Sequence, residues 1–199
     1  MFSRRYWLRV AMVGASVFAV TPAAADPGLE VAAANNAVGA IVAAEVGDGV
    51  QVVVDPQLGP TQIRVAGEVV DVAGTILRKG RFLDDPRNAA KLGAGIRKAL
   101  SAAYPERRAE FEANHRAWTH PFARRILTWN AALARSSVRG QRVANVHGRA
   151  ALLEWAGAVL DATAAARGPA ALATAPRGPA APTLASYIEY IEALVAAFA

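Results

Sequence analysis

Cysteine is absent from the 199-residue sequence, histidine occurs three times, and aromatic residues make up 7% of the chain. Without cysteine the protein has no disulfides, thiolate metal sites or cysteine nucleophiles. No serine lies in a nucleophile-elbow motif, and the sequence has no glycine-rich phosphate-binding loop. Because the three histidines do not pair with a nucleophile in any recognisable pattern, we expect a binding protein and not an enzyme.

The first 25 residues have the three parts of a cleavable signal peptide. Three arginines precede an apolar run over residues 10–20, and small residues follow it, namely Arg4, Arg5, Arg9 and then Ala23, Ala24 and Ala25. The run is shorter than the roughly 20 residues that a bilayer-spanning helix needs, which favours cleavage after Ala25 over a permanent anchor. Residues 3–9 resemble a twin-arginine motif, with the general secretory route as the alternative. The sequence therefore predicts an exported, periplasmic protein.

Part of the basic charge of the chain comes from this signal peptide. Removing its three arginines lowers the formal net charge from +6 to +3. The rest of the sequence has no basic stripe interleaved with aromatic residues, so we expect no binding to nucleic acid.

The region after the signal peptide predicts an α/β domain. Residues 29–54 have the pattern of a β-α-β unit, with a helix over about 35–46, a Gly-Asp-Gly turn and a second strand over 50–54. A right-handed crossover with parallel strands is expected for such a unit. Alternating valines over residues 63–72 indicate further extended segments, whose order in the sheet the pattern leaves open.

Two helices are predicted in the middle of the chain. Asp85 is a good N-cap, and Pro86 suits the first helical position of a helix over residues 86–103. A second helix begins at Pro105 and carries one continuous apolar stripe, formed by Phe111, Trp118, Phe122, Ile126, Trp129 and Leu133. Because Pro121 lies inside this helix, we expect a kink or a break near residues 119–120.

The last third of the chain predicts a strand over residues 142–146 that ends at His147, followed by a helix over about 149–160. Residues 162–182 are of low complexity, with the sequence RGPAA occurring twice, which indicates a flexible loop. A closing helix follows, in which Tyr187, Ile191, Leu194 and Phe198 share one face.

Four short motifs between residues 82 and 134 occur with the order and spacing of a known family: Asp85-Pro86-Arg87-Asn88-Ala89, Tyr104-Pro105-Glu106, Phe111-Glu112-Ala113-Asn114 and Trp129. This stretch resembles the middle of the zinc- and manganese-binding periplasmic solute-binding proteins of ABC importers. The resemblance implies a compact α/β fold of two lobes joined by a long helix. It assigns residues 26–104 to an N-terminal lobe, 105–136 to the connecting helix, and 137–199 to a shortened C-terminal lobe with the flexible loop 162–182.

The metal ligands of that family are mostly replaced in this chain. Two family histidines fall near Thr61 and at Arg81, the acidic ligand falls in a missing block, and only His147 keeps a ligand position. The resemblance thus implies weak binding of zinc or manganese with His147 as its anchor, and Asp84 and Glu154 are unplaced supplements. A partly buried, structural histidine is the alternative for His147.

The other charged residues of interest have simpler interpretations. Arg81 would repel a metal cation and could attract an anion instead. His115 lies on the apolar stripe and is expected to be packed, whereas His120 is expected to be solvated.

Together these features suggest a periplasmic solute-binding or accessory component of an ABC-type zinc or manganese uptake system. Its expected partners are a divalent metal ion and an ABC permease in the inner membrane, and we expect a monomer. The alternative is a degenerate relative that no longer binds metal and acts as a periplasmic interaction or regulatory protein.

Overall fold

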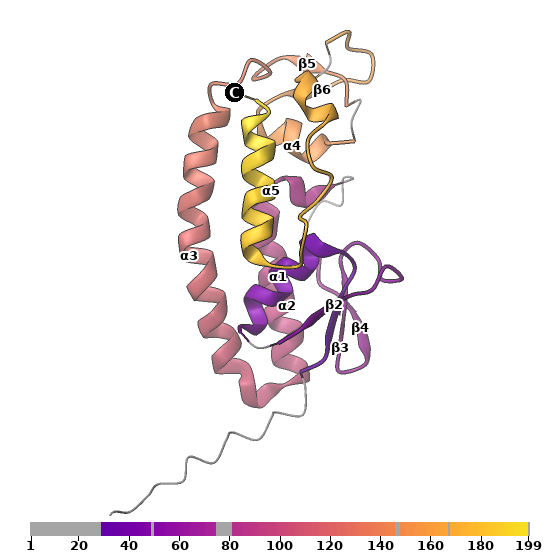
Figure 1. Ribbon diagram of the computed structural model, residues 1–199, viewed down its shortest axis with the longest axis vertical. Coiled ribbons are helices and arrows are strands. Elements are labelled where there is room, and N and C mark those ends of the chain that lie inside the picture. The colour runs from indigo at the N-terminus through magenta and orange to yellow at the C-terminus, as the bar shows by residue number, and fades with distance from the viewer. Residues whose placement is uncertain (1–28, 49, 75–80, 146–147, 167, 199) are drawn as a thin grey trace, which may run out of the picture.

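The computed structural model describes residues 29–48, 50–74, 81–145, 148–166 and 168–198 (Figure 1). The predicted signal peptide over residues 1–25 and the predicted ligand His147 lie outside these ranges. The described chain is a mixed α/β structure in which helices predominate over a small sheet. Within it, none of the helices combines the length and the apolar character that crossing a membrane requires.

The main sheet has four short strands in the order β2-β1-β3-β4. The first two, β1 (Val31–Ala33) and β2 (Val52–Val54), are parallel, as the β-α-β pattern predicts. The extended segments predicted over 63–72 form an antiparallel hairpin of β3 (Gln62–Val65) and β4 (Glu68–Asp71), and β3 pairs with β1. Ala66 and Gly67 turn the hairpin with positive φ angles of 50° and 82°, a conformation common in tight two-residue turns.

The helix α1 (Asn36–Val46) lies at the centre of the molecule and packs against α2, α3, α5 and the sheet. Its start agrees with the predicted boundary, because the Asn35 side chain accepts hydrogen bonds from the backbone N–H groups of Ala37 and Val38. Since partners surround it, its buried side chains are distributed around the helix instead of forming one stripe.

The two predicted central helices are present. A 3-10 turn, η1 (Phe82–Asp84), precedes α2 (Arg87–Ala103), whose buried residues follow the predicted three- and four-residue spacing. A second 3-10 turn, η2 (Pro105–Arg107), leads into α3 (Arg108–Leu133), where five of the six predicted stripe residues are buried and Ile126 is partly buried.

The predicted break in the second helix does not occur, because α3 continues through Pro121. Proline removes one backbone hydrogen bond, the one that the carbonyl of Ala117 would otherwise accept. Both Ala117 and Pro121 lie on the exposed side of α3, so water can solvate that carbonyl. The helix therefore tolerates the proline without ending there.

The region after α3 differs from the prediction. The strand expected over 142–146 is described only as β5 (Arg142–Val143), and the helix expected over 149–160 is the short α4 (Ala150–Trp155). Gly157, with φ of 86°, turns the chain after α4, and β6 (Val159–Leu160) then pairs in parallel with β5. The prediction of one continuous helix was wrong because the apolar residues near 159–160 belong to a strand.

The low-complexity segment over residues 162–182 packs against the rest of the protein at several points. It contains a 3-10 turn, η3 (Ala170–Ala173), in which Leu172 is buried. The Asn36 side-chain amide donates hydrogen bonds to the carbonyls of Pro179 and Ala180. The closing helix, α5 (Leu184–Ala196), follows this segment, and the Thr183 hydroxyl caps it by accepting from the backbone N–H of Ser186.

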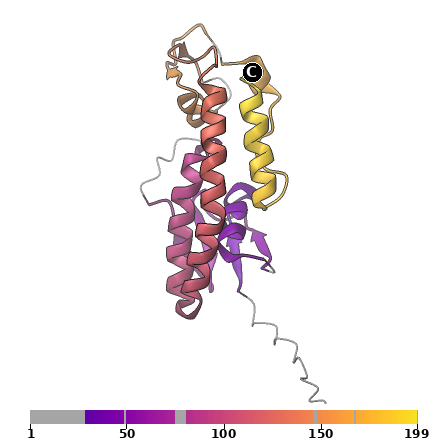
Figure 2. The ribbon, with the colours of Figure 1, turned by 90° about the vertical axis from the view of Figure 1, so that its left-hand side faces the viewer.

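Most of the buried apolar side chains form one hydrophobic cluster that runs through the whole described chain. Figures 1 and 2 show α3 extending along nearly the full height of the molecule, beside α1 and α2 at one end and α5 at the other. Aromatic rings from α3, α4 and α5 contact one another edge-on or stacked along this length, namely Trp118, Phe122, Trp129, Trp155 and Tyr187.

One close approach between α2 and the sheet gives a test of this packing. A Cβ atom added at Gly95 would lie 2.1 Å from the carbonyl oxygen of Val72, so any side chain there must push α2 away from the chain that follows β4. Replacing an exposed glycine in a helix by alanine normally raises the free energy of unfolding by about 1 kcal/mol. We expect Gly95→Ala instead to lower the free energy of unfolding by about 2 kcal/mol or more. Gly178→Ala, where the added Cβ meets no atom within 4 Å, is the control in urea denaturation.

Candidate functional site

A buried carboxylate, Asp84, lies beside Arg81 in the turn before α2. The turn η1 directs the Asp84 side chain inward, where only 2% of the residue remains exposed. The neighbouring Asp85 has a different role, because its carboxylate accepts from the backbone N–H of Arg87 and binds the guanidinium of the same residue. Asp84 is therefore the acid of this pair that is available for interior contacts.

The partner of Asp84 is Arg149, which precedes α4 and is itself 2% exposed. Its Nη1 lies 3.2 Å from Asp84 Oδ2. Its Nη2 donates to the carbonyls of Ala175 and Pro176 in the low-complexity segment, at 3.0 Å for Ala175. A second cation, Arg81, lies at the edge with its Nε 3.9 Å from the same Asp84 oxygen.

Two tyrosines from α5 complete the cluster. The Tyr190 hydroxyl donates to Asp84 Oδ1, and the Tyr187 hydroxyl donates to the carbonyl of Leu83 at 2.7 Å. Burial raises the pKa of the Asp84 carboxyl, while the Tyr190 hydrogen bond and the charges of Arg81 and Arg149 act against that rise. Burial and the Asp84 charge raise the pKa of Tyr190 far above neutral pH, so its hydroxyl remains a donor.

This arrangement is better suited to holding segments together than to holding a cation. Both oxygens of Asp84 face protein donors, and two guanidinium groups lie within 4 Å of Oδ2. A divalent metal ion next to them would be repelled by their charge. We refer below to Asp84, Arg81, Arg149 and Tyr190 as the Asp84 cluster.

The other predicted ligand positions do not assemble a metal site within the described ranges. Thr61 is buried, and its hydroxyl donates to Asp71 Oδ1 at 3.0 Å. Glu154 lies on the exposed side of α4. Among the described residues, no three His, Asp or Glu side chains come together as a metal-binding group, and His147 is not one of those residues.

A second buried acid, Glu45 of α1, lies at the interface with α2 and α3. It is fully buried, and its Oε1 lies 2.7 Å from His115 Nδ1 and accepts from Trp118 Nε1 at 2.8 Å. Its Oε2 has no hydrogen-bond partner among the described residues. Burial raises the pKa of this carboxyl, against the opposing effect of His115, Trp118 and Arg97. The packed position predicted for His115 thus includes a buried hydrogen bond, whereas His120 is exposed, as predicted.

Sequence reasoning missed three of these residues. Glu45 is the single charge in the apolar helix sequence NAVGAIVAAEV, and a lone acid in such a run is a signal for a buried partner. Arg149 follows His147 by two residues, at the start of the helix predicted over 149–160. Tyr190 lies in the predicted closing helix, on its buried side. Nothing local to either residue indicates its contact with Asp84.

Comparisons with protein-family models, with curated proteins and with solved structures found no match for this chain. The site is therefore interpreted from its own residues.

The Asp84 cluster leads to a stability prediction. Replacing Asp84 with asparagine leaves the buried Arg149 guanidinium without its counter-charge, so we expect a loss of about 3 kcal/mol in the free energy of unfolding. Glu192→Gln is the matched control, because it removes an acid from the half-exposed ion pair with Arg125 and should cost less than about 1 kcal/mol. Equal losses in the two variants, measured by chemical denaturation, would show that burial does not strengthen the Asp84 pair.

Glu45 and its two hydrogen-bond partners, His115 and Trp118, lead to a second stability prediction. Glu45→Ala removes the acceptor shared by His115 and Trp118, so we expect the variant to be less stable by about 2–3 kcal/mol. Glu45→Gln keeps an oxygen acceptor and should recover much of that loss, and Glu189→Ala on the exposed side of α5 should change stability by less than about 0.5 kcal/mol. Thermal unfolding of all three variants measures this ranking, and an alanine variant as stable as the glutamine variant would contradict it.

Proposed function

We propose that the protein is a periplasmic component of an ABC-type zinc or manganese uptake system, built on the solute-binding pattern, and that it acts as an accessory or interaction protein. The observation that carries this proposal is the Asp84 cluster. In support, Arg81, which stands at one ligand position implied by the resemblance, and the buried Arg149 both lie next to Asp84.

The electrostatics of the cluster support an accessory role over tight metal carriage. Tight zinc sites in proteins use three or four imidazole, thiolate or carboxylate ligands. Here Thr61 bonds to Asp71, Arg81 is a permanent cation, and Asp84 is engaged by protein donors. Of the family ligand positions, His147 is the one that retains a metal-binding side chain.

The two-lobe arrangement is part of the same proposal. We assign residues 26–104 and 137–199 to two shortened lobes and 105–136 to the connecting helix, which contains α3. In support, α3 packs against α1 and α2 in the first of these regions and against α5 in the second. The continuous hydrophobic core and the Asp84 cluster would then hold the two lobes in one fixed arrangement.

Weak metal binding at His147 is the second candidate, favoured by the position of this residue four residues after β5. The end of a strand is a common location for ligand-binding side chains in α/β proteins. If His147 binds metal, a permease partner would receive the metal-loaded protein. If the protein has the accessory role, the permease would receive it without metal.

Metal titration distinguishes the two candidates. For the wild-type protein we expect a dissociation constant for zinc or manganese in the micromolar range or weaker, because one imidazole contributes only part of a site. Arg81→His supplies a second imidazole and removes a cation, so it should tighten zinc binding about tenfold, whereas the control Arg81→Gln removes the cation alone and should have a smaller effect. Both are measured by calorimetry at neutral pH.

The same titration can refute the accessory role. Nanomolar binding by the wild type, retained in His147→Ala, would show that a tight site exists elsewhere in the chain. Nanomolar binding that His147→Ala abolishes would identify a true metal carrier with His147 as ligand.

A further inference from the structure

The charge of the chain is distributed very unevenly along its length. Between Ala113 and Leu153 there are seven arginines and no aspartate or glutamate. Three of these arginines form ion pairs with acids from other parts of the chain: Arg125 with Glu192, Arg142 with Asp161 and Arg149 with Asp84. The remaining four, Arg116, Arg124, Arg135 and Arg139, form no ion pair with a described acidic side chain.

Most of these unpaired basic side chains lie along one face of α3. Arg116, His120 and Arg124 are exposed and follow one another at four-residue spacing, and Arg135 continues the row just beyond the end of the helix. At about 100° per residue, these positions lie on the side of the helix opposite the buried stripe. We call these four residues the basic row.

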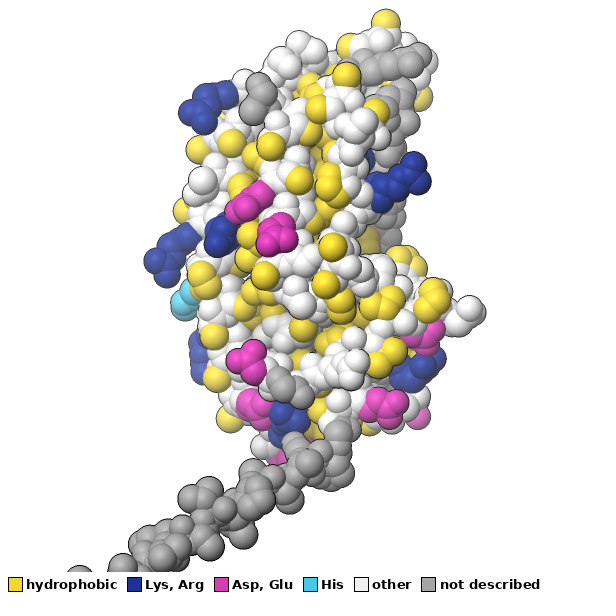
Figure 3. All heavy atoms as spheres, viewed as in Figure 1, with side chains coloured by type: hydrophobic (Ala, Val, Ile, Leu, Met, Phe, Trp, Pro, Cys, Tyr) yellow, Lys and Arg dark blue, Asp and Glu magenta, His cyan; other side chains and the backbone are white. Residues whose placement is uncertain are grey.

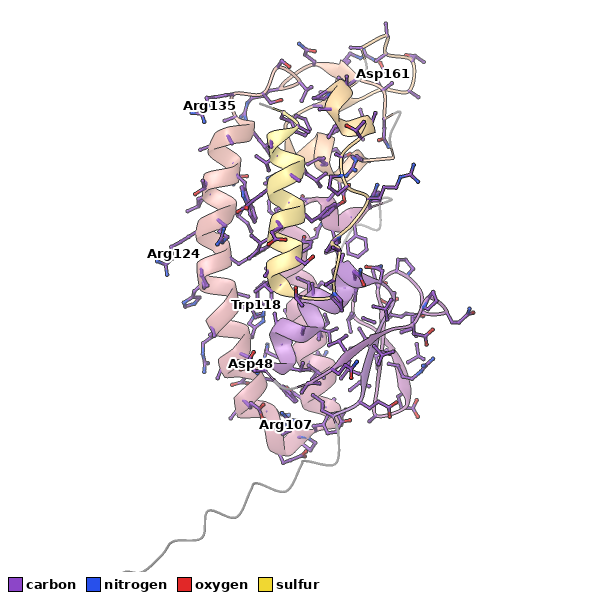
Figure 4. All side chains as sticks on the ribbon, in the orientation of Figure 1. Asp48, Arg107, Trp118, Arg124, Arg135 and Asp161 are labelled. Atoms are coloured by element: carbon purple, nitrogen blue, oxygen red, sulfur yellow. The ribbon has the colours of Figure 1, made fainter. Side chains whose placement is uncertain are left out.

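The views of the molecule agree on the exposure of this surface. Figure 2 shows α3 nearest the viewer with no other element in front of it. Figure 3 shows dark blue and cyan side chains along the α3 side, and in Figure 4 Arg124 and Arg135 point away from the body of the protein. No described acidic side chain forms an ion pair with Arg116, Arg124 or Arg135.

We propose that the basic row of α3 is a docking surface for an anionic phospholipid bilayer. Arginine binds phosphate groups with two parallel hydrogen bonds, and three unpaired guanidiniums in a row provide the complementary charge. The row extends about 28 Å at 1.5 Å per residue, along a continuous helix that can lie flat on a bilayer surface. This inference rests on the exposed surface alone and is independent of the proposed function.

The residues between the arginines fit a lipid surface better than an acidic protein partner. They are mostly small, with Ala117, Ala123 and Ala131 exposed, so the helix backbone can come close to a plane of headgroups. Leu127 lies in the middle of the row and is 68% exposed, which gives it access to the apolar boundary below the headgroups. A protein interface would instead be expected to have large anchoring side chains at its centre.

The test is co-sedimentation of the full chain with vesicles of equal parts phosphatidylglycerol and phosphatidylcholine, and with vesicles of phosphatidylcholine alone. The test variant is Arg116→Gln/Arg124→Gln/Arg135→Gln. The control variant Lys91→Gln/Lys98→Gln/Arg177→Gln removes the same charge from exposed positions outside the row. All three proteins retain residues 1–25, so any contribution of that segment is common to them.

We expect the wild type and the control variant to bind the anionic vesicles and the test variant to bind about a hundredfold more weakly. Binding of the wild type should weaken as salt rises from 50 to 300 mM. Equal binding by the test variant and the wild type, equal loss in both variants, or wild-type binding to phosphatidylcholine alone would each overturn the proposal. So would wild-type binding to polyglutamate without binding to vesicles, which would indicate an acidic protein partner.

Discussion

The ion pair between Asp84 and Arg149 is the interaction on which the arrangement of the C-terminal half depends. It connects the turn before α2 with the start of α4, and through Tyr190 and the carbonyls of Ala175 and Pro176 it also engages α5 and the low-complexity segment. Removing two charges from water is costly, and this cost offsets much of the attraction between them. Alternative packings of these segments would leave a buried charge unpaired.

The helices could be predicted from the sequence because their burial follows a local repeat. The spacing of Leu92, Ile96 and Leu100 is enough to indicate α2, and Asn35 marks the start of α1. The sheet order could not be predicted, since short valine-rich strands do not identify their partners. The helix predicted over 149–160 was wrong, because the turn at Gly157 and the pairing of β6 with β5 depend on residues distant in sequence.

The candidate site was less predictable than the helices, because its contacts join residues that are distant in sequence. Asp84 and Arg149 are 65 residues apart, and Glu45 and His115 are 70 apart, so no local pattern connects either pair. The resemblance singles out Arg81 as a replaced ligand position and Asp84 as an unplaced supplement, and both belong to the Asp84 cluster. The contact between Asp84 and Arg149, which directly precedes α4, could not be predicted, and the metal site expected at His147 stays a prediction.

The central position of α1 also affects the order in which the protein can fold. Its Asn36 side chain bonds to Pro179, 143 residues later, and α5 packs against it from the far end of the described chain. Such contacts have a high contact order, and the loop-closure entropy must be overcome before they stabilise the structure. During synthesis α1 therefore emerges long before its last partner, with its apolar surface still exposed to water. Until α5 has been synthesised, α1 lacks one of the helices that cover it, and only then can the core close.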